Sequence, residues 1–219
     1  MMKLSEKLFA KVVAEWDKAT EHPFVTAMAD GTLEADRFKA YMLQDYYYLT
    51  DYTEILAAIR AQAENAKLRD FLDEMIRAVQ YETANVHIPN MAQLGITEAD
   101  MQHTGKTPAC AEYLQYLKST AQEGTIRGLA ALLQCSWSYA YIARTVRDRY
   151  AAQVGGSAYL GWFETYTSAE YTGANQAWID LLDEETQGIS SEETEQLCSI
   201  FQRCAHYENS FWDCFLTSV

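Results

Sequence analysis

Glycine and proline are both scarce in this chain of 219 residues, which contains ten glycines and three prolines. Because these residues supply most tight turns, their scarcity argues against a fold built from many short strands. No run of four to eight residues alternates convincingly between apolar and polar side chains, whereas apolar residues recur at helical spacing throughout. The pattern predicts an all-α fold, a compact bundle of about eight helices with short connections.

Positive charge is scarce as well. The chain has 17 Lys and Arg residues against 31 Asp and Glu residues, and its net charge is −14. Nucleic acids and anionic membranes are therefore not expected as partners, because both are bound by clustered Lys and Arg. No apolar stretch reaches eighteen residues, and residues 1–6 lack the apolar region of a signal peptide, so no membrane span or secretion signal is expected.

The motifs that hold disulfides, metals or phosphates are missing. The five cysteines are odd in number and none forms a C-x-x-C pair, which favours reduced thiols in a cytoplasmic protein. None of the four histidines has a Glu three residues before it, as di-iron bundles require. No glycine-rich phosphate loop is present either. The motifs therefore give only weak support to a metal site, although haem ligation by His22 is conceivable.

The helical pattern runs along the whole chain without a linker, which predicts a single domain over residues 1–219, although this length also allows two small domains. The polar segment 96–106 is expected to be a loop. A capping-box pattern at Ser190-Ser-Glu-Glu193 predicts the start of the last helix. The other helices are expected at residues 5–20, 24–29, 33–63, 67–94, 108–124, 125–152, 158–166 and 169–183.

Residues 129–143 form the most distinctive stretch, fifteen residues without a charge. The run is too short to span a bilayer, so it predicts a helix that is buried on nearly all sides. Cys135 and Tyr139 lie one turn apart within it, on the same helix face. A lone cysteine in such a place is more often an inert core residue than a nucleophile.

Two carboxyl groups interrupt apolar helical stripes. Asp45 lies in the stripe of the second long helix, and Glu208 lies between Cys204 and Phe211 in the last one. A buried carboxyl must be ion-paired, hydrogen-bonded or protonated, so each residue is either a structural partner or a functional group. Burial is expected to raise the pKa of Glu208 above its ordinary value of about 4.3, which suits a general acid.

Four segments together resemble the TenA (thiaminase II) family, and their order and spacing cover almost the whole chain. They are Gln44-Asp45-Tyr46-Tyr47-Tyr48-Leu49, Cys135-Ser-Trp-Ser-Tyr139, Trp162-Phe-Glu-Thr-Tyr166 and Tyr207-Glu208-Asn-Ser-Phe211-Trp212. The resemblance implies a haem-oxygenase-like fold, a homotetramer and no cofactor. It also implies hydrolysis at a 4-amino-2-methylpyrimidine that bears a CH₂–leaving group at ring carbon 5. The substrates would be the aminomethyl pyrimidine, a breakdown product of thiamine, and thiamine itself.

The same resemblance implies roles for individual residues. Cys135 matches the nucleophile, Glu208 the acid/base, and Asp45 the carboxylate that holds the amino edge of the pyrimidine. Positions that line the pocket match four tyrosines, Tyr48, Tyr113, Tyr139 and Tyr166. The chemistry suits these residue types, because a soft thiolate can add to the ring, a buried acid can protonate a ring nitrogen, and aromatic faces can sandwich a flat ring.

Two other functions fit the same pattern. One is a haem-oxygenase-like oxidase that binds haem or a quinone, and the other is a non-catalytic protein that binds an aminopyrimidine. The sequence does not separate thiamine from the aminomethyl pyrimidine as the preferred substrate.

Overall fold

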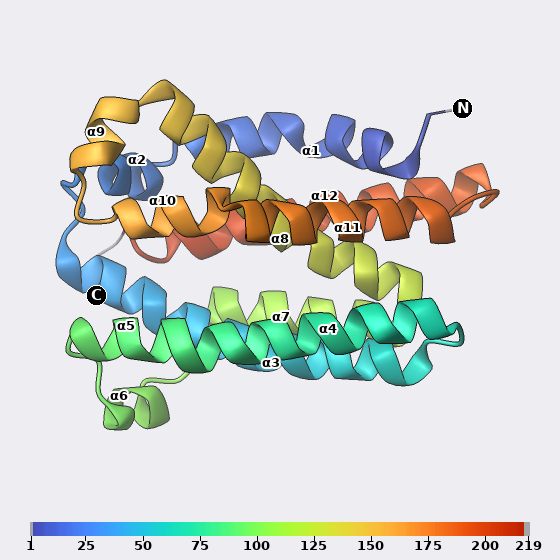
Figure 1. Ribbon diagram of the computed structural model, residues 1–219, viewed down its shortest axis with the longest axis horizontal. Helices are drawn as coiled ribbons and strands as arrows, with labels where there is room; N and C mark the ends of the chain where they lie inside the picture. The colour runs from blue at the N-terminus through green and yellow to red at the C-terminus, as the bar shows by residue number, and fades with distance from the viewer. Residues whose placement is uncertain (1, 217–219) are drawn as a thin grey trace. The chain divides into compact units, whose positions relative to one another are not determined.

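The computed structural model describes residues 2–216 (Figure 1). Over that range it has twelve α-helices, one π-helical segment and no strand, which confirms the all-α prediction. The described chain divides into two compact units. Unit 1 consists of the residues up to Leu33 together with Leu129–Leu216, and unit 2 consists of Glu34–Gly128. No helix among the described residues is both long and apolar enough to cross a membrane.

Unit 2 is built around one long helix, α3, which packs against α4 and α7. The side chain of Asn65 caps α4 by accepting a hydrogen bond from the backbone N–H of Leu68, and Thr107 caps α7 in the same way. The helices of this unit are α3 (Ala35–Gln62), α4 (Ala66–Glu82), η1 (Thr83–His87), α5 (Ile88–Gln93), α6 (Glu98–His103) and α7 (Pro108–Gln122).

Unit 1 holds the two ends of the described chain, and α1 packs along α12 in it. Three tryptophans, Trp16, Trp178 and Trp212, are buried within this unit. The predicted capping box at Ser190 and Glu193 is confirmed at the start of α12. The helices are α1 (Leu4–Thr20), α2 (Pro23–Asp30), most of α8 (Thr125–Arg149), α9 (Ala151–Gly156), α10 (Leu160–Thr167), α11 (Ala169–Glu185) and α12 (Ser191–Asp213).

The number of helices exceeds the prediction because two expected segments are subdivided and because α6 lies in the segment that was expected to be a loop. The expected helix over 67–94 divides into α4, η1 and α5, and Pro89 is the second residue of α5. Proline has no N–H to give to the preceding turn, so a regular helix is interrupted there. The expected helix over 125–152 ends at Arg149, because Tyr150 leaves the helical conformation before α9 begins.

The prediction of a loop over 96–106 is partly wrong, since α6 lies within it. The side chain of Thr97 accepts from the backbone N–H of Asp100, and the Asp100 carboxylate accepts from the backbone N–H of Thr97. This reciprocal cap stabilises a helix of six residues in a polar segment that has no apolar stripe.

Gly128 explains how α8 begins so close to α3. A Cβ atom at this position would lie 2.7 Å from Cδ1 of Ile59 and 3.1 Å from Cα of Ala121. The absence of a side chain therefore allows the first turn of α8 to pack directly on the buried side chain of Ile59 in unit 2.

Candidate active site

Cys135 lies on the α8 face that the charge-free sequence predicted, and its side chain is half-buried. The five residues before Gln134, Leu129 to Leu133, are completely buried. Cys110, Cys198 and Cys204 are buried too, and burial raises the pKa of the Cys198 thiol, with the charge of Glu195 adding to the effect. Cys135 is thus half-buried and directly follows a completely buried stretch of α8.

Hydrogen bonds from α11 fix the backbone of α8 directly beside this thiol. The side-chain amide of Asn175 donates to the carbonyl of Ser136 at 3.0 Å, while the Ser136 hydroxyl donates to the amide oxygen of Asn175. The Tyr171 hydroxyl donates to the same carbonyl at 3.2 Å. Asn175 is itself buried. Because these bonds join two helices of unit 1, they restrict both the rotation and the sliding of α8 at the candidate nucleophile.

Aromatic side chains surround Tyr139, the residue one turn after Cys135. The ring centroid of Tyr139 lies 4.9 Å from that of Tyr166 and 5.4 Å from that of Trp212. Trp162 contacts Tyr166 at 4.7 Å. Two of the predicted pocket-lining tyrosines, Tyr139 and Tyr166, are therefore in direct contact within unit 1.

Glu208 lies on α12 in the same unit, and 5% of its surface is exposed. Its neighbours along the helix face, Cys204 and Phe211, are buried as well. The structure thus confirms that this carboxyl group belongs to an apolar helix face, as its place in the sequence indicated.

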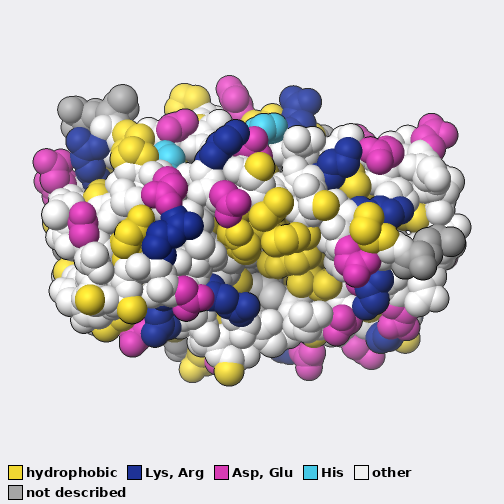
Figure 2. All heavy atoms as spheres, turned by 90° about the horizontal axis from the view of Figure 1, so that it is seen from above, with side chains coloured by type: hydrophobic (Ala, Val, Ile, Leu, Met, Phe, Trp, Pro, Cys, Tyr) yellow, Lys and Arg dark blue, Asp and Glu magenta, His cyan; other side chains and the backbone are white. Residues whose placement is uncertain are grey.

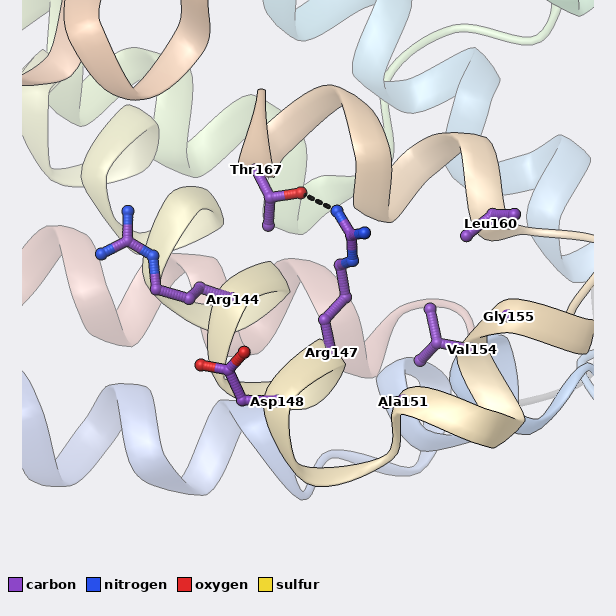
Figure 3. Close-up of a pocket in the computed structure, with 8 residues that line it drawn as sticks. All are labelled: Arg144, Arg147, Asp148, Ala151, Val154, Gly155, Leu160 and Thr167. Atoms are coloured by element: carbon purple, nitrogen blue, oxygen red, sulfur yellow. Dashed lines mark hydrogen bonds between the residues drawn. The ribbon is translucent and has the colours of Figure 1, made fainter. Parts of the chain in front are cut away.

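The position of Tyr166 is fixed by a polar contact at the next residue. Arg147 extends from α8 and donates to the hydroxyl of Thr167 (Figure 3). The Thr167 hydroxyl in turn donates to the carbonyl of Phe163 at 2.7 Å. These bonds attach the end of α10 to α8 beside a surface pocket. Its lining residues are Arg144, Arg147, Asp148, Ala151, Val154, Gly155, Leu160 and Thr167, and it includes none of the predicted site residues.

Unit 2 carries the other three predicted residues. Asp45 and Tyr48 lie one turn apart on α3, and both are buried. The ring of Tyr48 lies 5.5 Å from that of Tyr113 on α7 and 5.7 Å from that of Tyr52. Asp45 therefore lies on the same helix face as a cluster of tyrosine rings.

His87 is a neighbour of Asp45 that the sequence analysis did not single out. Its Nε2 atom lies 3.3 Å from Oδ2 of Asp45 and 3.3 Å from the carbonyl oxygen of Met42. His87 is the last residue of the π-helical segment, a local widening that is frequent at functional sites. Burial lowers the pKa of His87, although the Met42 carbonyl and the charge of Glu82 act in the opposite direction.

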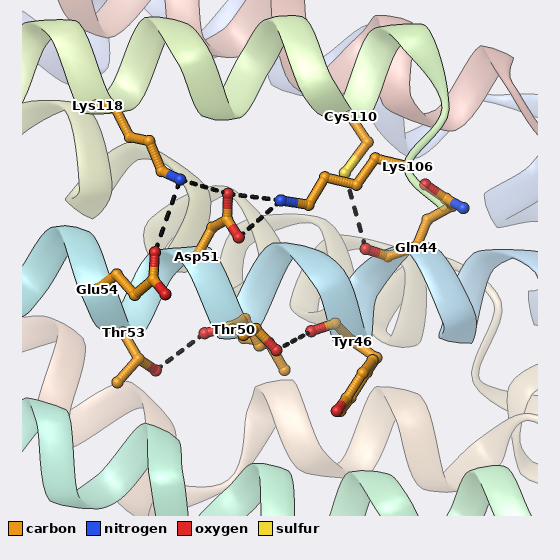
Figure 4. Close-up of polar contacts among 10 residues, drawn as sticks. Gln44, Tyr46, Thr50, Asp51, Thr53, Glu54, Lys106, Cys110 and Lys118 are labelled. Atoms are coloured by element: carbon orange, nitrogen blue, oxygen red, sulfur yellow. Dashed lines mark hydrogen bonds and ion pairs between the residues drawn. The ribbon is translucent and has the colours of Figure 1, made fainter. Parts of the chain in front are cut away.

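Asp45 and Asp51 are two buried acids on α3 whose pKa values are shifted in opposite directions. Burial raises the pKa of Asp45 from 3.8 to about 7. Burial acts on Asp51 too, but Lys106 and Lys118 both donate to its carboxylate and hold its pKa below the ordinary value (Figure 4). Asp51 is thus a charged structural anchor, whereas Asp45 has no cation to offset its burial.

The segment after α6 is also attached to α3 beside Asp45. The side chain of Gln44 donates to the carbonyl of Gly105 at 2.9 Å and accepts from the backbone N–H of Thr107 at 2.8 Å. The thiol of Cys110 donates to the backbone carbonyl of Gln44 (Figure 4). Together these contacts hold the start of α7 against the turn of α3 that carries Asp45.

The comparison with known proteins assigns the family. The model of the TENA/THI-4/PQQC family matches residues 9–218. The chain belongs to this family. It is 31% identical to an aminopyrimidine aminohydrolase from Helicobacter pylori, over 97% of this chain and 98% of that protein. It is 30% identical to an aminopyrimidine aminohydrolase from Halalkalibacterium halodurans, over 97% of this chain and 95% of that protein.

Solved structures agree with the fold. A TenA homologue from P. horikoshii OT3 superimposes with a TM-score of 0.84 at 29% identity, covering 98% of each chain. A domain with a haem oxygenase-like fold from Shewanella denitrificans superimposes with a TM-score of 0.75 at 17% identity, covering 95% of this chain and 90% of that one. The haem-oxygenase-like fold that the resemblance implied is therefore confirmed.

The raised pKa of Asp45 predicts how folding stability depends on pH. The folded state binds the Asp45 proton more tightly than the unfolded state does. This proton therefore adds to the free energy of unfolding below about pH 4, and the added stability is lost as the pH rises through about 7. A shift of about three units corresponds to on the order of 4 kcal/mol. Asp45→Asn should therefore be more stable than the wild type in urea unfolding above about pH 7, and the difference should vanish near pH 4.

Asp51→Asn provides the matched control, because the lowered pKa of Asp51 has the opposite sign. This variant should be less stable than the wild type at neutral pH, and the difference should shrink as acid protonates the carboxylate. An Asp45→Asn curve parallel to that of the wild type at every pH would contradict the assignment of a buried, proton-binding Asp45.

Proposed function

We propose that this protein is an aminopyrimidine aminohydrolase. It converts 4-amino-5-aminomethyl-2-methylpyrimidine into the 5-hydroxymethyl compound and ammonia, and it also cleaves thiamine. The observation that carries the proposal is a half-buried Cys135, on a helix whose backbone is held by hydrogen bonds from α11, in a chain of the TENA/THI-4/PQQC family. Two relatives that match nearly the whole chain bear the name of this activity, which supports the assignment.

The proposed reaction begins when the thiolate of Cys135 adds to ring carbon 6, while Glu208 gives a proton to the adjacent ring nitrogen. Electrons from the ring then form the exocyclic C=C bond as the bond between the side-arm CH₂ and its protonated amine breaks, so that the leaving group is ammonia. Water adds its oxygen to the exocyclic methylene and releases one proton to the solvent. The ring nitrogen returns its proton to Glu208 as the thiolate leaves carbon 6, so that the enzyme is regenerated.

The remaining predicted residues bind the substrate. Asp45 accepts a hydrogen bond from the exocyclic amine, and the tyrosine rings at 48, 113, 139 and 166 pack on the faces and edges of the pyrimidine. Support comes from the two aromatic contacts within the units, Tyr139 with Tyr166 and Tyr48 with Tyr113. We propose that residues of both units act on the same substrate, so that the chain functions as one domain.

The direct test is turnover of the purified protein with the aminomethyl pyrimidine and with thiamine. Release of ammonia, and of the thiazole from thiamine, should accompany formation of the hydroxymethyl pyrimidine, and kcat/KM for the two substrates identifies the preferred one. Tight binding of the aminopyrimidine without turnover would instead identify a non-catalytic binding protein. Turnover that depends on oxygen or on a coloured cofactor would overturn the proposal in favour of an oxidase.

The first variant to measure is Cys135→Ser. It should lower kcat by about 10³-fold or more, since an alcohol is a much weaker nucleophile than a thiolate, and the circular dichroism spectrum should not change. Cys214→Ser is the matched control, because Cys214 is also half-buried and lies outside the proposed site. Normal kcat in Cys135→Ser would exclude the covalent route.

Glu208→Gln separates catalysis from binding. The amide keeps the size of the side chain but cannot exchange a proton, so kcat should fall about 10²-fold or more while the Kd of the hydroxymethyl product changes little. Glu195→Gln makes the same chemical change at an exposed position of α12 and should leave kcat unchanged. A rise in KM with normal kcat in Glu208→Gln would reassign this residue to binding.

We also propose that the protein assembles as a homotetramer and works in the cytoplasm, which keeps thiols reduced. Figure 2 shows hydrophobic side chains gathered near the middle of one face. In unit 1 the ring of Phe9 contacts those of Trp137 and Tyr141, with centroids 6.0 Å and 5.9 Å apart, and all three residues are half-buried. Such a surface favours contact with another copy.

Light scattering should give a mass four times the 24.9 kDa of one chain. Phe9→Glu, which places a charge in the aromatic surface, should dissociate the assembly. A monomer at micromolar concentration for the unmodified chain would contradict the tetramer, and cell fractionation checks the compartment.

A further inference from the structure

Two side chains of α11 meet the backbone of α8 at one oxygen atom directly after the candidate nucleophile. The hydroxyl of Tyr171 and the side-chain amide of Asn175 both donate to the carbonyl of Ser136, at 3.2 Å and 3.0 Å. Tyr171 and Asn175 lie one turn apart, on the same face of α11. The hydroxyl of Ser136 donates to the amide oxygen of Asn175, which fixes the end of the amide that faces the carbonyl.

The carbonyl of Cys135 itself also receives a side-chain donor. The hydroxyl of Ser138 donates to it at 2.8 Å. A carbonyl oxygen in a helix accepts one bond from the N–H four residues later and keeps a second lone pair, which a side chain can use. The turn of α8 that carries the thiol is therefore held through two successive carbonyls, one bonded within α8 and one bonded to α11.

Tyr171 also contacts one of the predicted pocket-lining residues. Its ring centroid lies 5.0 Å from that of Tyr166, and the two ring planes meet at 83°. The ring of Tyr166 in turn lies 4.9 Å from that of Tyr139, which is one turn after Cys135. The contacts therefore lead from α8 to α11, from there to α10, and back to α8. All of these residues belong to unit 1.

The rotation of α8 about its own axis determines where the sulfur atom lies. The Cα atoms of a helix lie about 2.3 Å from its axis, and a side-chain atom such as Sγ lies roughly 4 Å from it. A rotation of about 15° therefore moves Sγ by about 1 Å, and such a misplacement can lower a rate about 10²-fold. The bonds to Ser136 resist this rotation, because hydrogen bonds are lost when they lengthen by a few tenths of an ångström.

We propose that Tyr171 and Asn175 are positioning residues for the nucleophile, and that Tyr171 couples the orientation of Cys135 to the position of Tyr166. This inference rests on the proposed function and adds residues that act through the backbone of α8. The bonds end on the carbonyl of Ser136, so they fix the rotation of the turn without changing the thiol itself. Their loss should lower the rate of attack on the ring and leave the affinity for the pyrimidine nearly unchanged.

Two variants separate the two contacts of Tyr171. Tyr171→Phe keeps the ring and loses the hydroxyl, so kcat should fall about tenfold, while the Kd of the hydroxymethyl product, measured by calorimetry, should stay within about twofold of the wild type. Tyr171→Leu also removes the ring that packs on Tyr166. In this variant kcat should fall at least as far, and the Kd should rise about fivefold as well.

Two further variants separate the bonds of Asn175. Asn175→Leu is similar in size and removes both the donor and the acceptor, so kcat should fall about 100-fold. Ser136→Ala removes the bond to the amide oxygen but keeps both donors on the carbonyl, so kcat should fall by only about threefold. Tyr171→Phe decides the question alone if Asn175→Leu does not fold.

Stability and thiol reactivity are measured on the same variants. Asn65→Ala, which removes the cap of α4 in unit 2, should lower Tm by about 2–4 °C with kcat within about twofold of the wild type. Gln176→Ala, at the exposed neighbour of Asn175, should change neither. Iodoacetamide should alkylate Cys135 in Tyr171→Phe at no less than the wild-type rate, since a small reagent reacts with a thiol without being held in one orientation.

The outcomes distinguish this inference from the proposed function. A wild type without turnover refutes the proposed function, whatever the α11 variants do. When the wild type is active and depends on Cys135, a kcat within about twofold of the wild type in Tyr171→Phe overturns the positioning role. A loss no greater than that of Asn65→Ala does the same. A parallel fall in kcat and in the alkylation rate also overturns it, because the bonds would then act on the reactivity of the thiol and not on its orientation.

Discussion

Burying a carboxyl group in a helical core is the constraint on which the candidate site depends. A charged oxygen in an apolar environment must meet a cation, accept hydrogen bonds or take up a proton. Helix α3 contains two of these solutions within two turns. Asp51 is charged because Lys106 and Lys118 both reach it, whereas Asp45 has only a neutral imidazole beside it and binds its proton up to about pH 7. The first arrangement stabilises unit 2, and the second leaves a buried carboxyl group without an opposing charge.

Polar groups are also satisfied in the core around α8, the helix with the candidate nucleophile, but there by uncharged side chains. Its segment 129–143 has no charge, so it can run through unit 1 without ion pairs. The buried Asn175 supplies the polar contacts instead, by binding both the carbonyl and the hydroxyl of Ser136. A thiol on a helix held in this way can react without first becoming ordered, which is an advantage for attack on a ring carbon.

Local patterns in the sequence predicted the features that are determined within a single helix. The apolar spacing predicted an all-α chain, and the interruptions of that spacing identified Asp45 and Glu208 as buried acids, which they are. What the sequence could not predict depends on contacts between segments. His87 reaches Asp45 across 42 positions because of the register of a π-helical turn before Pro89, and neither period nor composition specifies that register. The short helix α6 was missed because its stability comes from a cap and not from an apolar face.

The central claim is that Cys135, Glu208 and Asp45 act on one aminopyrimidine, and a crystal structure with the hydroxymethyl product tests it most directly. We expect Sγ of Cys135 beside ring carbon 6, Glu208 on the adjacent ring nitrogen, and the carboxyl of Asp45 on the edge formed by ring nitrogen 3 and the amine. A product bound in the pocket beside Arg144 and Arg147, with no contact to these three residues, would contradict the account.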